Sequence, residues 1–135
     1  MGGGFEGLGS ADGQLKRPRG LRFTGDGTGL AVADWYNDRV SVFRMEDGSF
    51  ARHVATGLSV PIDVEECEGG WLVACCSSDT IEFVGGDVDG GVGRARLGKC
   101  GRGDGEFYTP SALALVPGLG LVVREIYNGR FQVFG

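Results

Sequence analysis

The chain gathers its hydrophobic residues in short runs separated by glycine, aspartate and asparagine, a pattern typical of β-strands joined by tight turns. Pro18 opens one such run, because proline fixes φ and lacks an N–H and therefore suits the first residue of a strand. A turn at residues 25–27 leads to a second run, which is nearly free of polar residues until Asp34 and indicates a strand covered on both faces. The Asn-Asp pair at 37–38 then predicts a tight turn into a third strand at 39–43.

The same pattern returns twice, which makes the chain a set of repeats of about 45 residues. The copy from Pro110 to Phe134 matches the first copy closely, including the Asp-Gly sequence before the proline and the Asn-x-Arg turn. The copy that starts at Pro61 is weaker, because Ser78 and Thr80 replace the asparagine and the arginine.

Further runs extend two of these copies. Phe50–Ala55 reads as a fourth strand of the first copy, and Arg94–Leu97 hints at a fourth strand of the second. The third copy shows three strands before Gly135. We therefore predict an all-β fold of about three four-stranded antiparallel units, the last of them without its outer strand.

An acidic and a basic position flank the same turn in two of the copies. Asp34 and Arg39 hold these positions in the first copy, and Glu125 and Arg130 hold them in the third. The second copy has uncharged residues at both positions, so the acid and the arginine disappear together. We predict a cross-strand ion pair in copies one and three, of a kind that contributes about 0.2–1 kcal/mol when it is exposed.

Three features in succession resemble the NHL repeat: Gly-x-apolar-x-x-Pro, an apolar strand that ends in Asp, and Asn-x-Arg-apolar-x-Val-Phe. The resemblance implies a β-propeller-type fold, in which typically about six blades of four antiparallel strands surround an axis. It divides the chain into a flexible glycine-rich segment (1–10), a first repeat (11–56), a degenerate second repeat (57–100) and a third repeat (101–135) without its outer strand. The residues that carry the repeat motif are Pro18, Asp34, Asn37, Arg39, Phe43, Pro61, Pro110, Glu125, Asn128, Arg130 and Phe134.

The resemblance also implies an open half-ring, because three copies make about half of such a propeller. Blades stack face to face, so each blade depends on its neighbours to cover its apolar surfaces. Terminal blades would expose such surfaces, which normally mark the place of a partner. We expect further blades, or another copy of this chain, to cover them.

Composition and charge narrow the classes of function. Glycine supplies 27 of the 135 residues, which fits a protein with many tight turns. The formal net charge of −5 disfavours nucleic-acid binding, because that binding depends on lysine and arginine. The sequence shows no apolar run long enough to span a membrane and no secretion signal, so we expect a cytoplasmic protein with buried, reduced cysteines.

Few residues offer catalytic or metal chemistry, and no cofactor or metal is expected. His53 is the single histidine, assigned to a strand surface, and the four cysteines lack C-x-x-C spacing. Asp87 and Asp89 resemble a calcium loop only faintly, since the distal glutamate is missing, and we interpret them as a solvated turn. A basic cluster is interpreted as a surface loop, with contact to RNA or an acidic partner as the alternative; it comprises Arg94, Arg96, Lys99 and Arg102.

The turns after the second strands carry the candidate binding residues. Trp35 and Tyr36 stand in this turn of the first copy, and Ile126 and Tyr127 stand in that of the third. Exposed aromatic residues on loops anchor protein partners, whereas packing between blades is the alternative and the preferred interpretation of these side chains.

The predicted function is a non-catalytic scaffold that binds a protein or peptide through one rim of loops. Members of the resembled family often serve as the recognition part of ubiquitin-ligase proteins, and others bind RNA. Some NHL-like propellers are metal-dependent lyases or hydrolases. A RING or B-box has no place here, given four unpaired cysteines and one histidine. An RNA-binding propeller and a fragment of a propeller lyase or hydrolase are the alternatives.

Overall fold

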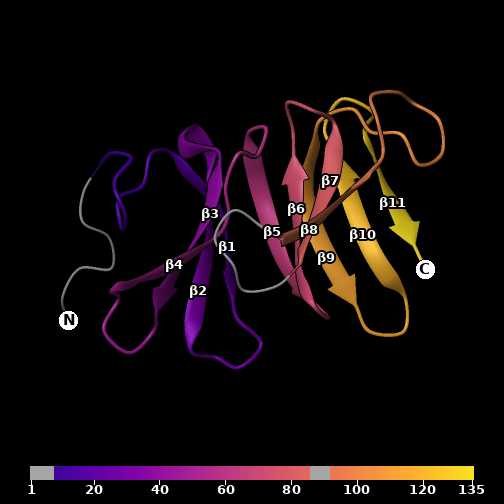
Figure 1. Cartoon of the computed structure of the whole chain (residues 1–135). Coiled ribbons are helices and arrows are strands. Elements are labelled where there is room, and N and C mark those ends of the chain that lie inside the picture. Colours follow the sequence, from indigo (N-terminus) through magenta and orange to yellow (C-terminus); the bar gives the residue numbers. More distant parts are fainter. Residues whose placement is uncertain (1–7, 86–91) are drawn as a thin grey trace.

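The computed structural model describes residues 8–85 and 92–135 (Figure 1). This part of the chain consists of short strands joined by turns, with one 3-10 turn, η1 (Trp35–Asn37). The strands are β1 (Pro18–Phe23), β2 (Gly29–Asp34), β3 (Arg39–Arg44), β4 (Phe50–Ala55), β5 (Pro61–Cys67), β6 (Gly70–Cys75), β7 (Thr80–Gly85), β8 (Val92–Leu97), β9 (Pro110–Val116), β10 (Gly120–Glu125) and β11 (Arg130–Phe134).

These strands form three antiparallel sheets in which each strand pairs with its neighbour along the chain. Sheet 1 has the order β1-β2-β3-β4, sheet 2 has β5-β6-β7-β8, and sheet 3 has β9-β10-β11. Figure 1 shows the sheets side by side in chain order, with sheet 2 between the other two. The predicted all-β fold of repeated antiparallel units is confirmed, including the fourth strands of the first two units. Among the described strands no sheet closes on itself.

The pairing register confirms the alignment of the three copies. In each sheet the last residue of the second strand lies opposite the first residue of the third strand. These pairs are Asp34 and Arg39, Cys75 and Thr80, and Glu125 and Arg130. Matching positions in the sequence are therefore matching positions in the sheets.

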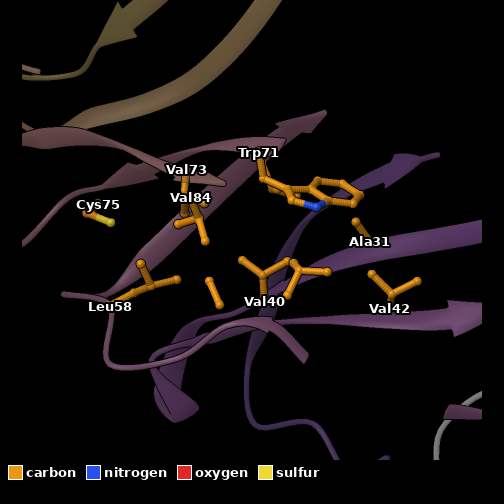
Figure 2. Close-up of a cluster of buried hydrophobic side chains, with 11 residues drawn as sticks. Ala31, Val40, Val42, Leu58, Trp71, Val73, Cys75 and Val84 are labelled. Atoms are coloured by element: carbon orange, nitrogen blue, oxygen red, sulfur yellow. The ribbon is translucent and has the colours of Figure 1, made fainter. Parts of the chain in front are cut away.

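Sheets 1 and 2 pack against each other through apolar side chains. Val40 and Val42 of β3 belong to one buried cluster with Trp71 and Val73 of β6, as Figure 2 shows. Leu58, from the connection between the two sheets, joins the same cluster. Burial of a side chain of this size stabilises the fold by about 1.5–3 kcal/mol.

Sheets 2 and 3 pack through a second cluster of the same kind. Ile81 of sheet 2 lies in this cluster with Leu113 and Val123 of sheet 3. Phe107, from the segment that precedes β9, is fully buried among them. A third cluster, around Val32, lies on the face of sheet 1 that points away from sheet 2. Each sheet thus carries apolar residues on both faces.

The first strands of the sheets are linked by polar contacts. Arg22 of β1 lies 2.6 Å from Glu65 of β5 and donates to the backbone oxygen of Leu113 in β9. Asp63 Oδ2 accepts from the Leu113 N–H at 2.9 Å. Gly20 of β1 lets β1 approach Asp63 of β5 closely, because a Cβ at residue 20 would lie 2.3 Å from Asp63 Oδ1. The first strands therefore hold the three sheets in a fixed order.

Residues 8–10 are bound to the first unit, although they were assigned to the flexible N-terminal segment. Leu8 forms a β-bridge with Leu15, and the Gly9 N–H donates to the Leu15 oxygen. These contacts connect residues 8 and 9 to the segment that enters β1. The remainder of that segment, residues 1–7, lies outside the described residues.

Candidate functional site

Asp34 ends β2 and Arg39 begins β3, so their side chains meet across η1. Arg39 Nε donates to Asp34 Oδ2 at 3.1 Å, and both residues are buried. The predicted cross-strand ion pair is therefore confirmed in the first copy. It is buried rather than exposed because the segment that leads into β1 covers it.

Arg39 and Asn37 hold the backbone of that segment. Their side-chain N–H groups donate to carbonyl oxygens at 2.8–3.0 Å. The acceptors belong to Gly9, Ser10, Ala11 and Gln14. We call Asp34, Asn37 and Arg39, together with residues 9–14, the first arginine clamp. The clamp gives partners to carbonyl groups that lie outside any strand, and buried polar groups without partners are costly.

Sheet 3 repeats this arrangement, which we call the second arginine clamp. Arg130 Nε lies 2.8 Å from Glu125 Oε2, and its Nη2 donates to the carbonyl oxygens of Gly103 and Glu106. Asn128 donates to Glu125 Oε1, as Asn37 does to Asp34. The predicted second ion pair is confirmed.

Electrostatics favour the charged form of Glu125. Burial by itself would raise the pKa of this carboxyl, but hydrogen bonds from Arg130, Gln132 and Asn128 and from the Tyr108 N–H hold the pKa below its ordinary value. Glu125 is thus a carboxylate at neutral pH, although it is 1% exposed.

Sheet 2 has no clamp at the matching position. Cys75 and Thr80 face each other there, and both are buried. The connection into β5 is short, and its Leu58 enters the core, so it leaves no long loop for an arginine to hold. The second copy thus lacks both the charged pair and the long loop that such a pair holds in the other two copies. Burial raises the pKa of the Cys75 thiol to about 12, with a further contribution from the nearby Glu82 carboxylate.

One aspartate in each of the first two sheets makes a hydrogen bond to the next sheet. Asp38 Oδ1 accepts from the Val60 N–H at 3.2 Å, and Asp79 Oδ1 accepts from the Thr109 N–H at 2.7 Å. Val60 and Thr109 precede the prolines that open β5 and β9, and their φ angles are +57° and +55°. A positive φ is unfavourable for β-branched residues, so these contacts hold a strained backbone in place.

These contacts join the turns of the three sheets into one row. The Val60 and Thr109 oxygens accept from the Cys76 and Ile126 N–H groups of the next turns. We call the exposed end of the molecule the aromatic rim. It consists of the turns at residues 35–38, 76–79 and 126–129, of residues 17, 19, 60, 108 and 109 next to the three prolines, and of Arg102 beside Tyr127.

The candidate aromatic residues lie on this rim and are accessible. Tyr36 is 50% exposed and Tyr127 is 69% exposed, while Trp35 is half-buried and its ring makes a T-shaped contact with Tyr36. Within the described residues neither tyrosine is buried between two sheets. Ile126 is also exposed.

Three further rim residues were not recognised from the sequence. Arg17 lies over the Tyr36 ring at 5.0 Å, Arg19 lies over the Trp35 ring at 5.1 Å, and Tyr108 packs beside Tyr127. The available signal was their position, because each is within two residues of a repeat proline. A small cavity of about 220 Å³ lies beside Tyr127, lined also by Arg102, Asn128 and Arg130.

Several other assignments change. His53 is buried rather than on a surface, with Nδ1 at 3.1 Å from Ser41 Oγ and Nε2 at 2.9 Å from Asp12. Arg94 and Arg96 lie on β8 near the buried Glu82, which agrees with the predicted fourth strand and not with the surface loop to which the basic cluster was assigned.

The thiols are only partly as expected. Cys75 is buried, but Cys100 is exposed, and the four cysteines are free. The weak calcium-loop pattern at Asp87 and Asp89 falls outside the described residues. Where residues are described, histidine, cysteine and acidic side chains do not gather in threes that could hold a metal ion.

No helix in residues 8–85 or 92–135 is long and apolar enough to cross a membrane. Comparison with protein-family models and with curated proteins found no match to this chain.

Proposed function

We propose that the chain forms three blades of an NHL-type β-propeller and is a non-catalytic scaffold that binds a protein or peptide through the aromatic rim. The observation that carries this proposal is the exposure of Tyr36 and Tyr127 at equivalent turns of two different sheets. Tyrosine, tryptophan and arginine dominate the binding energy of protein interfaces, and the rim brings all three together.

The chemistry of the rim favours a partner with carboxylate and apolar side chains. Arg17, Arg19 and Arg102 are exposed there, although the whole chain is acidic. An arginine fork binds a carboxylate through two hydrogen bonds. The cavity beside Tyr127 has room for one side chain of a bound peptide.

Hydrogen bonds also hold the rim turns in place before any partner binds. The two arginine clamps and the Asp38 and Asp79 contacts fix the turns that carry the aromatic residues. A preorganised surface loses little conformational entropy on binding. In the resembled family such a scaffold is often the recognition part of a larger ubiquitin-ligase protein, and we propose that context for this chain.

RNA binding is the second candidate, favoured by the stacking of Arg17 and Arg19 on aromatic rings. Aromatic platforms beside arginines bind single-stranded nucleic acid. The two candidates differ in their response to salt, because nucleic-acid affinity falls steeply with salt concentration.

Selection from a displayed peptide library tests the main proposal. Selected peptides are expected to bind the wild-type chain. Their affinity for Tyr127→Ala and for Tyr36→Ala, measured by fluorescence anisotropy, is expected to be about tenfold or more lower than for the wild type. Leu119→Ala is the matched control, because Leu119 is as exposed as Tyr36 but lies in the β9–β10 turn, away from the rim turns.

The outcomes separate the candidates. Equal loss of affinity in the Leu119→Ala control, or no selected peptide that depends on the tyrosines, would contradict peptide binding at the rim. Binding of a single-stranded RNA oligonucleotide that weakens steeply with salt and requires Arg17 would favour the second candidate.

A further inference from the structure

We propose that two copies of this chain associate head to tail, with the open face of sheet 3 in one copy covered by the open face of sheet 1 in the other. The proposal is independent of the rim and rests on the interface that the chain builds twice within itself. Both halves of that interface are exposed once more at the two ends of the row of sheets (Figure 1).

Each sheet has two distinct faces. The first face carries the residue three positions after the opening proline: Leu21, Val64 or Leu113. The second face carries the residue that follows the first residue of the third strand: Val40, Ile81 or Phe131. Within the chain, the second face of one sheet always meets the first face of the next. Val40 lies in one cluster with Val64, and Ile81 lies in another with Leu113.

The open face of sheet 3 is a second face. Phe131 is 68% exposed, whereas the matching Val40 and Ile81 are 0% and 1% exposed. Val133 and Val116 are exposed on the same face. An apolar residue at a position that is buried in both other sheets indicates a face made for burial.

The open face of sheet 1 is a first face. Leu21 is 58% exposed, whereas the matching Val64 and Leu113 are 0% and 3% exposed. Phe23 is exposed beside it. The face that covers a second face inside the chain is therefore available, unused, at the opposite end of the same chain.

These facts identify a second copy as the occupant. One chain exposes one first face and one second face, and sheet 2 lies between them, so a second copy offers the matching half at each end. Contact between two different faces is heterologous, unlike the self-matched contact of an ordinary two-fold dimer. Arg124 marks a difference from the internal interfaces, since it stands where the other sheets have Ala33 and Ala74; it folds onto Ser111 of its own sheet, 3.1 Å away.

Two variants that each disable one face test this arrangement. Phe131→Lys and Leu21→Lys place a charge on an exposed position of the second and the first open face, respectively. Light scattering with size-exclusion chromatography, over a range of concentrations, is expected to show association of the wild-type chain. Each variant alone is expected to be a monomer, with affinity reduced by about tenfold or more.

Mixing the two variants gives the decisive result. The intact first face of Phe131→Lys and the intact second face of Leu21→Lys are expected to restore one interface and form a one-to-one pair. Leu119→Lys, a charge on an exposed turn outside both faces, is expected to associate like the wild type.

Three results would overturn the proposal. A wild-type chain that stays monomeric at every concentration would assign the open faces to a different partner. Association of Leu21→Lys alone would indicate self-matched pairing of sheet 3. Dissociation by Leu119→Lys would indicate non-specific contact. Circular dichroism of each variant establishes that the compared proteins are folded.

Discussion

Asp34 and Arg39 lie 3.1 Å apart in a buried ion pair, and the remaining N–H groups of Arg39 bind the backbone that enters β1. The pair therefore links β2 to β3 and also attaches the loop before β1 to sheet 1. Glu125 and Arg130 do the same in sheet 3. Sheet 2, which has no long loop, has no such pair.

Removal of one partner tests the first clamp. Arg39→Met is expected to lower the free energy of unfolding by about 3–5 kcal/mol, because it removes the ion-pair partner of the buried Asp34 side chain. Urea unfolding followed by fluorescence measures the loss. The double variant Asp34→Asn with Arg39→Met is expected to recover part of it. Arg44→Met, at the exposed end of β3, is the control and is expected to cost less than about 1 kcal/mol. A loss that small for Arg39→Met would contradict a role in the clamp.

The second clamp predicts a pH dependence. The folded-state pKa of Glu125 is below its ordinary value, so the carboxylate contributes stability that is complete above the unfolded-state pKa and is lost as pH falls through the folded-state pKa. The difference in unfolding free energy between wild type and Glu125→Gln is expected to be largest near neutral pH and to shrink in acid. Urea unfolding at a series of pH values measures it, with the exposed Glu46→Gln as control. A difference that is constant with pH would argue against this charge effect.

The contacts between sheets predict a local effect. Asp79→Ala removes the acceptor 2.7 Å from the Thr109 N–H and is expected to cost about 1–3 kcal/mol of stability. Hydrogen exchange followed by NMR is expected to show faster exchange of the Thr109 amide. Asp38→Ala is expected to act in the same way on the Val60 amide. Asp104→Ala, in an exposed turn, serves as control. Unchanged exchange in both variants would show that these contacts do not hold the strained residues.

The cysteines are expected to differ in reactivity. Burial raises the pKa of Cys75 to about 12, so its thiol is protonated as well as inaccessible. Iodoacetamide is expected to alkylate Cys100 well before Cys75 in the native chain, as measured by mass spectrometry of peptides. In denaturing urea the rates are expected to converge. Early labelling of native Cys75 would mean that the interface between sheets 1 and 2 opens readily.

The sequence predicted the strands of the fold and the charged pairs of the two clamps. The prolines, glycine turns and apolar runs determined strand number and pairing, because these signals are local in the sequence. Comparison of copies also identified the pairs Asp34 with Arg39 and Glu125 with Arg130, since two residues that change together across repeats are in contact here. The aromatic turns at Tyr36 and Tyr127 were recognised by the same comparison.

The tertiary structure alone decided burial and long-range partners. The sequence placed His53 on a surface, but the structure buries it. Only the structure shows that Arg39 Nη2 donates to the carbonyl oxygen of Gln14 and that the Asp38 carboxylate accepts from the Val60 N–H. These outcomes depend on which backbone groups the packing of neighbouring segments leaves unpaired. A one-dimensional pattern carries the period of a strand, but it carries no distance between residues that only folding brings together.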